Sequence, residues 1–160
     1  MRAGVLRPPV TDETHLRRTF ELAREAAANE NTPFGSLLVR EGEVIAESRN
    51  TTRTDEDVTA HPELKLARWA ARELADGEQR EVTMYTSTEP CPMCAGAMAI
   101  AGLGRVVYSV DGATAAEFAP GDGSMPSSDL LERESDIEVI GPELEAKGKA
   151  VHRECWDDAG

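Results

Sequence analysis

The chain of 160 residues has few of the features that mark secreted or membrane-spanning proteins. It contains three cysteines, Cys91, Cys94 and Cys155, and this odd number argues against a disulfide framework and favours metal binding or redox chemistry. No run approaches the ~18 apolar residues that cross a bilayer, and the first ten residues lack the apolar segment of an export signal. We therefore expect a soluble, cytoplasmic protein with no membrane partner.

Lysine is also scarce. Lys65, Lys147 and Lys149 are the only lysines among 17 basic residues, while 30 acidic residues bring the net charge to -13. Nucleic-acid binding draws much of its affinity from cationic contacts to phosphates, and the sequence shows no basic cluster, so a nucleic-acid partner is disfavoured. An acidic, lysine-poor surface resembles adaptation to high salt.

The spacing of apolar residues predicts the secondary structure of the first half. Leu16, Phe20, Ala23 and Ala27 recur at helical spacing, which predicts a helix within residues 11–31 that begins at Thr11 or Asp12. Two apolar runs, 33–40 and 43–48, are joined by a short turn and predict an antiparallel hairpin. A polar loop, 50–60, leads to a helix over 62–74.

The second half alternates strands and helices. Strands are expected at 81–87, 105–110 and 136–140, with helices at 94–102, 113–118, 127–134 and about 142–155, and a Gly/Pro/Ser-rich surface loop at 120–128. The helical connection before the last strand makes that strand parallel to its neighbour. This order predicts an α/β fold with a five-stranded mixed sheet between helices, forming one domain of residues 1–160 with a core of about 12–155.

Two cysteines stand three positions apart in the stretch TEPCPMC, residues 88–94. At the first turn of a helix both sulfurs can face one point, where the helix dipole and a cation favour thiolates. Zinc suits such a pair and needs either two more ligands or one more ligand and a water.

His61 is the best candidate for a third ligand among His15, His61 and His152. It precedes Pro62 at the start of the predicted second helix, and Glu63 follows two positions later. Three protein ligands leave one tetrahedral position for water, as in catalytic rather than structural zinc sites. Glu63 would then be the base that accepts the water proton.

Other interpretations of these residues remain open. The Cys91–Cys94 pair alone also fits a redox pair. Cys91, Cys94, His152 and Cys155 would make a closed structural zinc site in a protein without enzymatic activity. Taken singly, His61 also fits a capping or core histidine, and Glu63 an ordinary first-turn acid.

The motif H-x-E followed by P-C-x-x-C, here His61-Pro62-Glu63 and Pro90-Cys91-Pro92-Met93-Cys94, resembles the zinc-dependent cytidine-deaminase-like superfamily. The stretches PFGSLLV, AESRN and CAGAMAIAGLGRVVYS are similar to further family segments, so the resemblance covers about residues 12–110. It implies a three-layer α-β-α sandwich. It also implies one Zn²⁺ per chain, with a bound water or hydroxide, held by His61, Cys91 and Cys94, and Glu63 as the catalytic proton carrier.

The resemblance further suggests residues that contact the substrate. Asn50 matches a family asparagine that binds the substrate, and the other candidates are Phe34, the carbonyl of Ala60, Thr88, Glu89 and Trp156. A turn asparagine at position 50 and core packing of Phe34 and Trp156 are the alternatives. His15 and His152 are expected to be surface or structural residues.

The implied activity is hydrolysis of the C–N bond of a cyclic amidine, releasing ammonia from a nucleobase or nucleoside. Within the superfamily, the parallel last strand resembles the branch of guanine, fungal-type cytosine, deoxycytidylate and transfer-RNA adenosine deaminases, and EPCPMC and the C-terminal helix resemble guanine deaminase most. Cytosine or cytidine is the second candidate, another amino-heterocycle a third, and a transfer-RNA adenosine deaminase the alternative. Pro62, where alanine is commonest, and AMAIAG, which lacks bulky aromatic residues, depart from the guanine deaminase pattern. A homodimer is expected by analogy.

The acidic composition predicts a dependence of stability on salt. If the surface is adapted to high salt, the melting temperature should fall when salt is withdrawn, because acidic side chains then repel one another unscreened. Thermal melting from low to molar potassium chloride measures this effect. A melting temperature indifferent to salt would argue against the adaptation.

Overall fold

Five strands of the described chain form one mixed sheet in the order β2-β1-β3-β4-β5. The computed structural model describes residues 12–119 and 127–158. β1 pairs antiparallel with β2 and β3, while β3–β4 and β4–β5 are parallel. The strands are β1 Gly35–Arg40, β2 Glu43–Arg49, β3 Val82–Thr88, β4 Arg105–Val110 and β5 Glu138–Ile140.

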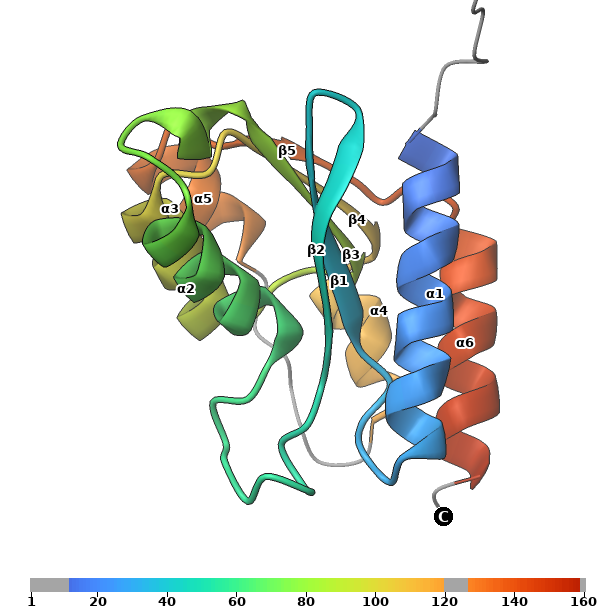
Figure 1. The fold of residues 1–160 in the computed structure, drawn as a ribbon. Helices are drawn as coiled ribbons and strands as arrows, with labels where there is room; N and C mark the ends of the chain where they lie inside the picture. Colours follow the sequence, from blue (N-terminus) through green and yellow to red (C-terminus); the bar gives the residue numbers. More distant parts are fainter. Residues whose placement is uncertain (1–11, 120–126, 159–160) are drawn as a thin grey trace, which may run out of the picture.

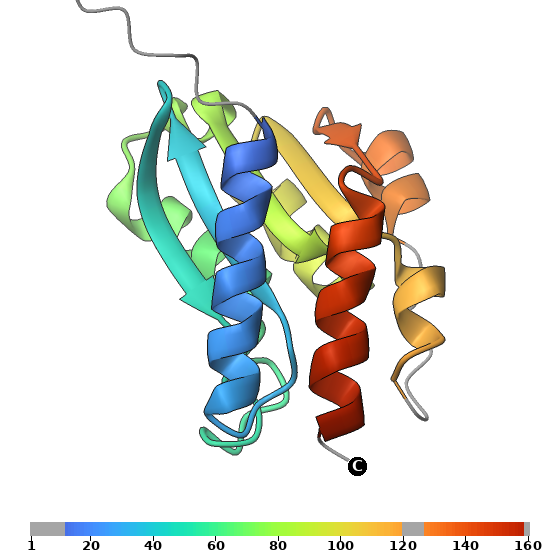
Figure 2. The same ribbon diagram turned by 90° about the vertical axis from the view of Figure 1, so that its right-hand side faces the viewer.

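Helices cover both faces of this sheet (Figure 1, Figure 2). α1 and α6 lie side by side on one face, and α2, α3 and α5 lie on the other. The helices are α1 Asp12–Ala28, α2 Pro62–Glu73, α3 Pro92–Ala101, α4 Gly112–Ala116, α5 Ser128–Glu134 and α6 Glu145–Asp158, with a 3-10 turn, η1, at Glu78–Glu81. The predicted α/β three-layer fold with an antiparallel hairpin and a parallel last strand is confirmed.

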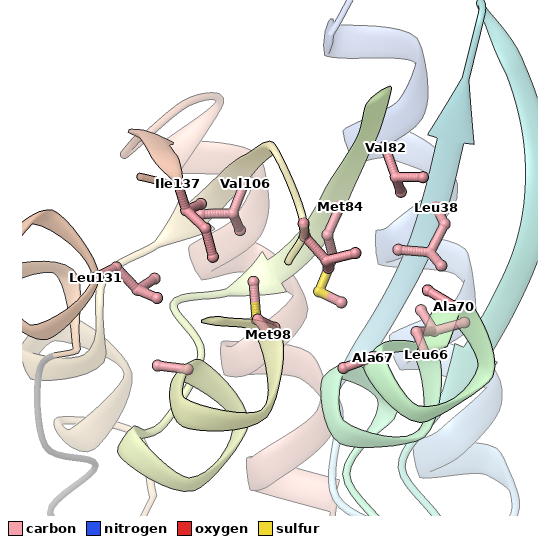
Figure 3. Close-up of a cluster of buried hydrophobic side chains, with 12 residues drawn as sticks. Leu38, Leu66, Ala67, Ala70, Val82, Met84, Met98, Val106, Leu131 and Ile137 are labelled. Atoms are coloured by element: carbon pink, nitrogen blue, oxygen red, sulfur yellow. The ribbon is translucent and has the colours of Figure 1, made fainter. Parts of the chain in front are cut away.

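Alternation along the central strands divides the core into two layers. Leu38 and Met84 belong to the apolar cluster under α2 and α3, whereas Leu37 and Tyr85 belong to the cluster under α1 and α6. Figure 3 shows the first cluster, with Met84 and Met98 both lying between the sheet and the helices. Because successive side chains point to opposite faces, both central strands are buried on both sides.

Gly35 allows α1 to lie directly against the start of β1. A Cβ atom at this position would stand 2.6 Å from the Leu22 Cβ and 2.6 Å from the Thr19 carbonyl oxygen. Both distances are far below van der Waals contact, so a larger residue would push the helix off the strand. The residue that follows, Ser36, therefore has a fixed position on the opposite face, toward α2.

The structure corrects some predicted boundaries. The last helix begins at Glu145 rather than at about 142, because Leu144 has a φ of 50° in the left-handed region and cannot continue a right-handed helix. η1 was not predicted. Within the predicted loop 120–128, residues 120–126 lie outside the described residues, and Ser128 begins α5. His15 is buried, with its ring centroid 4.7 Å from that of Tyr85, which agrees with a structural role.

None of the helices in the described ranges combines the length and the apolar character that crossing a bilayer requires.

Candidate active site

Two helices that begin with proline direct their N-termini to one place at the end of the sheet. His61 is the N-cap of α2 and Cys91 is the N-cap of α3, each followed by a proline in the first turn. Proline is suited to that position because its missing N–H is not needed there. The His61 side chain makes no capping hydrogen bond to its own helix, and its Nδ1 lies 3.6 Å from Cys91 Sγ in the space between the two helix starts.

The donor atoms of His61, Cys91 and Cys94 form a tight triangle. His61 Nδ1 lies 3.6 Å from Cys91 Sγ and 3.5 Å from Cys94 Sγ, and the two sulfurs are 3.5 Å apart. In tetrahedral coordination, Zn–S bonds of about 2.3 Å and Zn–N bonds of about 2.0 Å separate the ligand atoms by about 3.5–3.8 Å. The three side chains therefore fit a zinc ion, and three protein ligands leave a fourth position for water.

The pKa values of His61, Cys91 and Cys94 also indicate a metal-binding site. A hydrogen bond from Cys94 lowers the pKa of Cys91 to about 4 and raises the pKa of Cys94, so one thiolate forms readily and the second needs a cation. The hydrogen bond with Cys91 raises the pKa of His61. A divalent cation at this point would allow both sulfurs to be thiolates and the imidazole to be neutral.

Glu63 lies beside this triangle in the first turn of α2 and is 5% exposed. Ser36 Oγ donates to its Oε1 at 3.0 Å, and Thr86 Oγ1 lies 3.3 Å from the same oxygen. Burial raises the pKa of Glu63, opposed by the positive charge of His61. A carboxyl group with a raised pKa can both accept and return a proton near neutral pH.

A cavity of about 520 Å³ opens onto the triangle. Glu63, His61 and Cys91 are at its wall together with the polar residues Asn50 and Thr88. Aromatic and small apolar side chains form most of the rest of the wall, namely Phe34, Trp156, Val58, Ala115, Ala116 and Ala119. No lysine or arginine among the described residues lines the cavity, so its walls suit an uncharged ligand.

Five of the six predicted substrate contacts line this cavity: Asn50, Phe34, Thr88, Glu89 and Trp156. Ala60 is not at the wall in the described chain. Its carbonyl oxygen instead accepts a hydrogen bond from the Thr51 amide at 3.1 Å, which closes the loop before α2.

Asn50 is buried at the end of β2 with its amide held in one orientation. Its Oδ1 accepts hydrogen bonds from the Thr52 amide at 3.0 Å and the Thr52 hydroxyl at 2.9 Å. In the described part of the chain its Nδ2 group has no protein partner. Asn50 therefore offers the cavity an N–H donor, which suits a carbonyl oxygen or a ring nitrogen of a ligand.

Glu89 has a different relation to the cavity. Its carboxylate accepts hydrogen bonds from the amides of Gly112, Ser127 and Ser128, at 2.7–2.9 Å, and from the Ser128 hydroxyl at 2.9 Å. These bonds fasten the starts of α4 and α5 beside the metal triangle. Because both carboxylate oxygens already accept these hydrogen bonds, Glu89 mainly holds α4 and α5 in place beside the cavity.

His152 on α6 lies behind the cavity wall, next to the lining residues Thr88 and Trp156, and is 1% exposed. Its Nε2 lies 2.8 Å from Thr88 Oγ1, and its Nδ1 accepts a hydrogen bond from Trp156 Nε1 at 3.0 Å. Phe118 stacks on the imidazole at 5.8 Å, and Phe34 meets it edge-on at 5.7 Å. Burial lowers the pKa of His152 to about 4, so the ring is neutral at physiological pH.

Sequence reasoning missed Ser36, Thr86 and the position of His152. Ser36 carried a weak signal, because it is the one hydroxyl residue in the otherwise apolar beginning of the strand GSLLVR. Its partner Thr86 lies directly opposite in the β1–β3 register. No comparable signal marked His152, since its position depends on how α6 packs across the sheet.

The structure does not assemble the alternative sites. His152 bonds to Thr88 and Trp156, and Cys155 lines a separate cavity with Arg24 and Arg53. In the described ranges, His61, Cys91 and Cys94 are the one cluster of possible metal ligands. Cys91 and Cys94 are thiols in this structure, with their sulfurs 3.5 Å apart rather than the about 2.05 Å of a disulfide bond.

Comparison with known proteins agrees with this geometry. The sequence model described as "Cytidine and deoxycytidylate deaminase zinc-binding region" matches residues 9–110. The chain is 31% identical to the probable cytosine deaminase of Schizosaccharomyces pombe over 152 residues, 91% of this chain and 93% of that one. It is 41% identical to guanine deaminase of Bacillus subtilis over 106 residues, 66% of this chain and 68% of that one.

A solved structure from a study of transfer-RNA A34 deaminases superposes with a TM-score of 0.72 at 27% identity. The match covers 87% of this chain and 99% of the other. Relatives named for three different substrates are thus similar to this chain in sequence or in fold, and the choice among those substrates depends on its own cavity.

Metal content tests the ligand set. Cys94→Ser and His61→Ala should each lower bound zinc well below one ion per chain, because two remaining ligands hold the ion weakly. Cys155→Ser is the matched control, and it should keep full zinc content. Elemental analysis after dialysis measures the ratio, and loss of zinc in Cys155→Ser would instead support the closed structural site.

The buried His152 predicts an acid-sensitive stability. Between pH about 6.5 and about 4 the unfolded chain binds a proton at this residue and the folded chain does not, so the folded state loses up to about 3 kcal/mol as the pH falls. His152→Gln keeps a donor and an acceptor but does not titrate. Urea denaturation of both proteins across this pH range should show a steeper loss for the unmutated protein, and parallel curves would contradict the prediction.

Proposed function

The chain belongs to the cytidine and deoxycytidylate deaminase zinc-binding family, and we propose that it removes an exocyclic amino group from a free nucleobase or nucleoside. Guanine is the first candidate and cytosine or cytidine the second. Family membership makes the protein a zinc-dependent deaminase. The observation that carries the proposal is the buried carboxyl group of Glu63 next to three zinc-compatible donors in a cavity without cationic residues.

His61, Cys91 and Cys94 would hold the zinc. When bound, zinc lowers the pKa of a coordinated water so that this water can attack carbon at neutral pH. The net reaction adds water to the amidine carbon and releases ammonia, leaving a carbonyl group on the ring.

Glu63 moves the protons of this reaction. It accepts one proton from the attacking water and passes it to the ring nitrogen next to the reacting carbon, then relays a proton to the departing amine. The hydrogen bond from Ser36 holds Oε1, which leaves Oε2 to face the reactants. Burial favours this role, because a dry carboxyl group has a pKa nearer to the working pH.

The walls of the cavity support a small, uncharged ring as substrate. Phe34 and Trp156 offer flat apolar surfaces, and Asn50 offers a donor for a carbonyl oxygen. A phosphate or a transfer-RNA stem would need cationic partners, which the described lining lacks. Local identity is higher to guanine deaminase, and the match to cytosine deaminase extends over more of the chain, so these two bases lead the candidates.

The proposal includes the assembly and extent of the enzyme. Residues of about 12–155 would form the catalytic domain of a cytoplasmic homodimer. Met93 and Ile100 on α3 are 39% and 90% exposed, seven residues apart and so on one face of the helix. An exposed apolar face beside the active site is suited to a second copy.

Glu63→Gln tests the proton-carrier role. This variant should keep zinc and fold, and lose about 10²–10⁴-fold in the rate of ammonia release, because the amide cannot carry the proton. Glu73→Gln, at the exposed end of the same helix, is the matched control and should retain the rate. The assay measures ammonia from guanine, cytosine, adenine, their nucleosides and related amino-heterocycles.

Two outcomes would refute the proposal. If Glu63→Gln released ammonia undiminished, Glu63 would not be the proton carrier. If the zinc-loaded protein released ammonia from none of these compounds, the substrate class would be wrong.

A further inference from the structure

The hydrogen-bond chain Trp156–His152–Thr88 joins α6 to the wall of the cavity. His152 and Trp156 are four residues apart, so they lie one turn apart on the same face of α6. Thr88 is the last residue of β3 and lines the cavity next to the metal triangle. None of these three residues holds the metal or moves a proton in the proposed mechanism, so their arrangement calls for a separate explanation.

This hydrogen-bond chain fixes the tautomer of the His152 imidazole. An indole Nε1–H can only donate a hydrogen bond, so His152 Nδ1 must be an unprotonated acceptor. The aromatic rings of Phe34 and Phe118 around the imidazole give it an apolar environment that disfavours a second proton. The proton of the neutral ring therefore resides on Nε2 and is donated to Thr88 Oγ1 at 2.8 Å.

The fixed tautomer in turn fixes the direction of the Thr88 hydroxyl. A threonine hydroxyl has one hydrogen to donate, and it can accept as well. Since Thr88 Oγ1 accepts from His152 and has no other partner in the described chain, its hydrogen is left to point toward the cavity. Thr88 Oγ1 keeps a second lone pair, but a ligand that donated to it would leave the hydroxyl hydrogen without an acceptor, so an acceptor atom is the favoured ligand partner.

We propose that Thr88 selects the substrate by donating a hydrogen bond to an acceptor atom of the ring, and that His152 and Trp156 are positioning residues that hold Thr88 in this role. The inference rests on the proposed deaminase function and names a specificity determinant within it. The acceptor would be a ring nitrogen without hydrogen or a carbonyl oxygen. A ring that presents an N–H at this point would leave the Thr88 hydroxyl hydrogen without an acceptor and would bind more weakly.

The tautomer can be measured without any substrate. In the zinc-loaded protein labelled with ¹⁵N-histidine, long-range proton–nitrogen spectra distinguish a protonated from an unprotonated ring nitrogen. We expect His152 to be protonated at Nε2 alone at neutral pH. In Trp156→Phe, which keeps an aromatic ring and removes the indole N–H, the Nδ1–H form should become populated.

Ligand binding tests the donor role of Thr88. The Glu63→Gln protein, loaded with zinc, would be titrated calorimetrically with guanine and with its deaza analogues, in which one ring nitrogen acceptor is replaced by C–H, and with the corresponding pair for cytosine. Introducing Thr88→Val into the Glu63→Gln protein should weaken binding of the parent base about ten- to a hundredfold, because the acceptor atom of the base loses its hydrogen-bond donor. Thr88→Ser keeps the hydroxyl group, so its affinity for the base should lie within about threefold of that of the protein with Thr88.

The analogues give the sharper result. One deaza analogue lacks the ring acceptor that the Thr88 hydroxyl contacts. For that analogue, Thr88→Val should leave the affinity unchanged, because there is no hydrogen bond to lose. Thr83→Val, the same substitution at the other end of β3, is the matched control and should affect no ligand.

The outcomes separate this inference from the proposed function. An Nδ1–H tautomer in the unmutated protein, or equal losses in Thr88→Val for the base and all its analogues, would overturn the role of Thr88 even if ammonia were released. Absence of ammonia release from the catalytically intact protein, with bases bound and Thr88 sensitivity present, would overturn the proposed reaction and support the donor role.

Discussion

The burial of Glu63 is the constraint on which the active site depends. An uncompensated carboxylate in a protein interior costs several kcal/mol, so its surroundings must offer donors or positive charge. Ser36 from β1, Thr86 from β3 and the nearby His61 provide them. Ser36 and Thr86 are direct partners in the strand register, 2.8 Å apart through their hydroxyls. A slip of one residue would turn Ser36 to the α1 side and leave Glu63 without its closest donor.

The sheet also determines where the metal ligands meet. β3 ends at Thr88, and the chain turns at once into α3, so Cys91 lies at the carboxyl end of a central parallel strand. β2 ends at the same edge, because it runs antiparallel to β1, and its loop leads into α2 at His61. Both helices thus present positive N-terminal dipoles to the shared site. That field favours thiolates, and it helps a small site to hold two cysteines in ionised form.

The sequence predicted the metal triangle and the order of the elements because both depend on local patterns. His61-Pro62-Glu63 and Cys91-Pro92-Met93-Cys94 each occupy a single helix start, where spacing alone sets the geometry. The hydroxyls that hold Glu63 depend on strand register, and the position of His152 depends on packing between α6 and a strand far away in sequence. Long-range contacts of this kind have no periodic signal. The carboxylate of Glu89 illustrates the same limit, since its bonds to Ser127 and Ser128 depend on how α5 returns to β3.

The placement of arginine explains why the cavity suits a neutral ring. Arg18, Arg40 and Arg105 form ion pairs with carboxylates on the outer surface, and no arginine among the described residues reaches the cavity. In the proposed function, recognition there would depend on hydrogen bonds from the buried Asn50 and Thr88 and on contact with the half-buried rings of Phe34 and Trp156. Salt screens exposed charges strongly and such buried contacts weakly. A cavity that avoids charge recognition would therefore keep its affinity at high ionic strength, where a phosphate-binding site would lose much of its affinity.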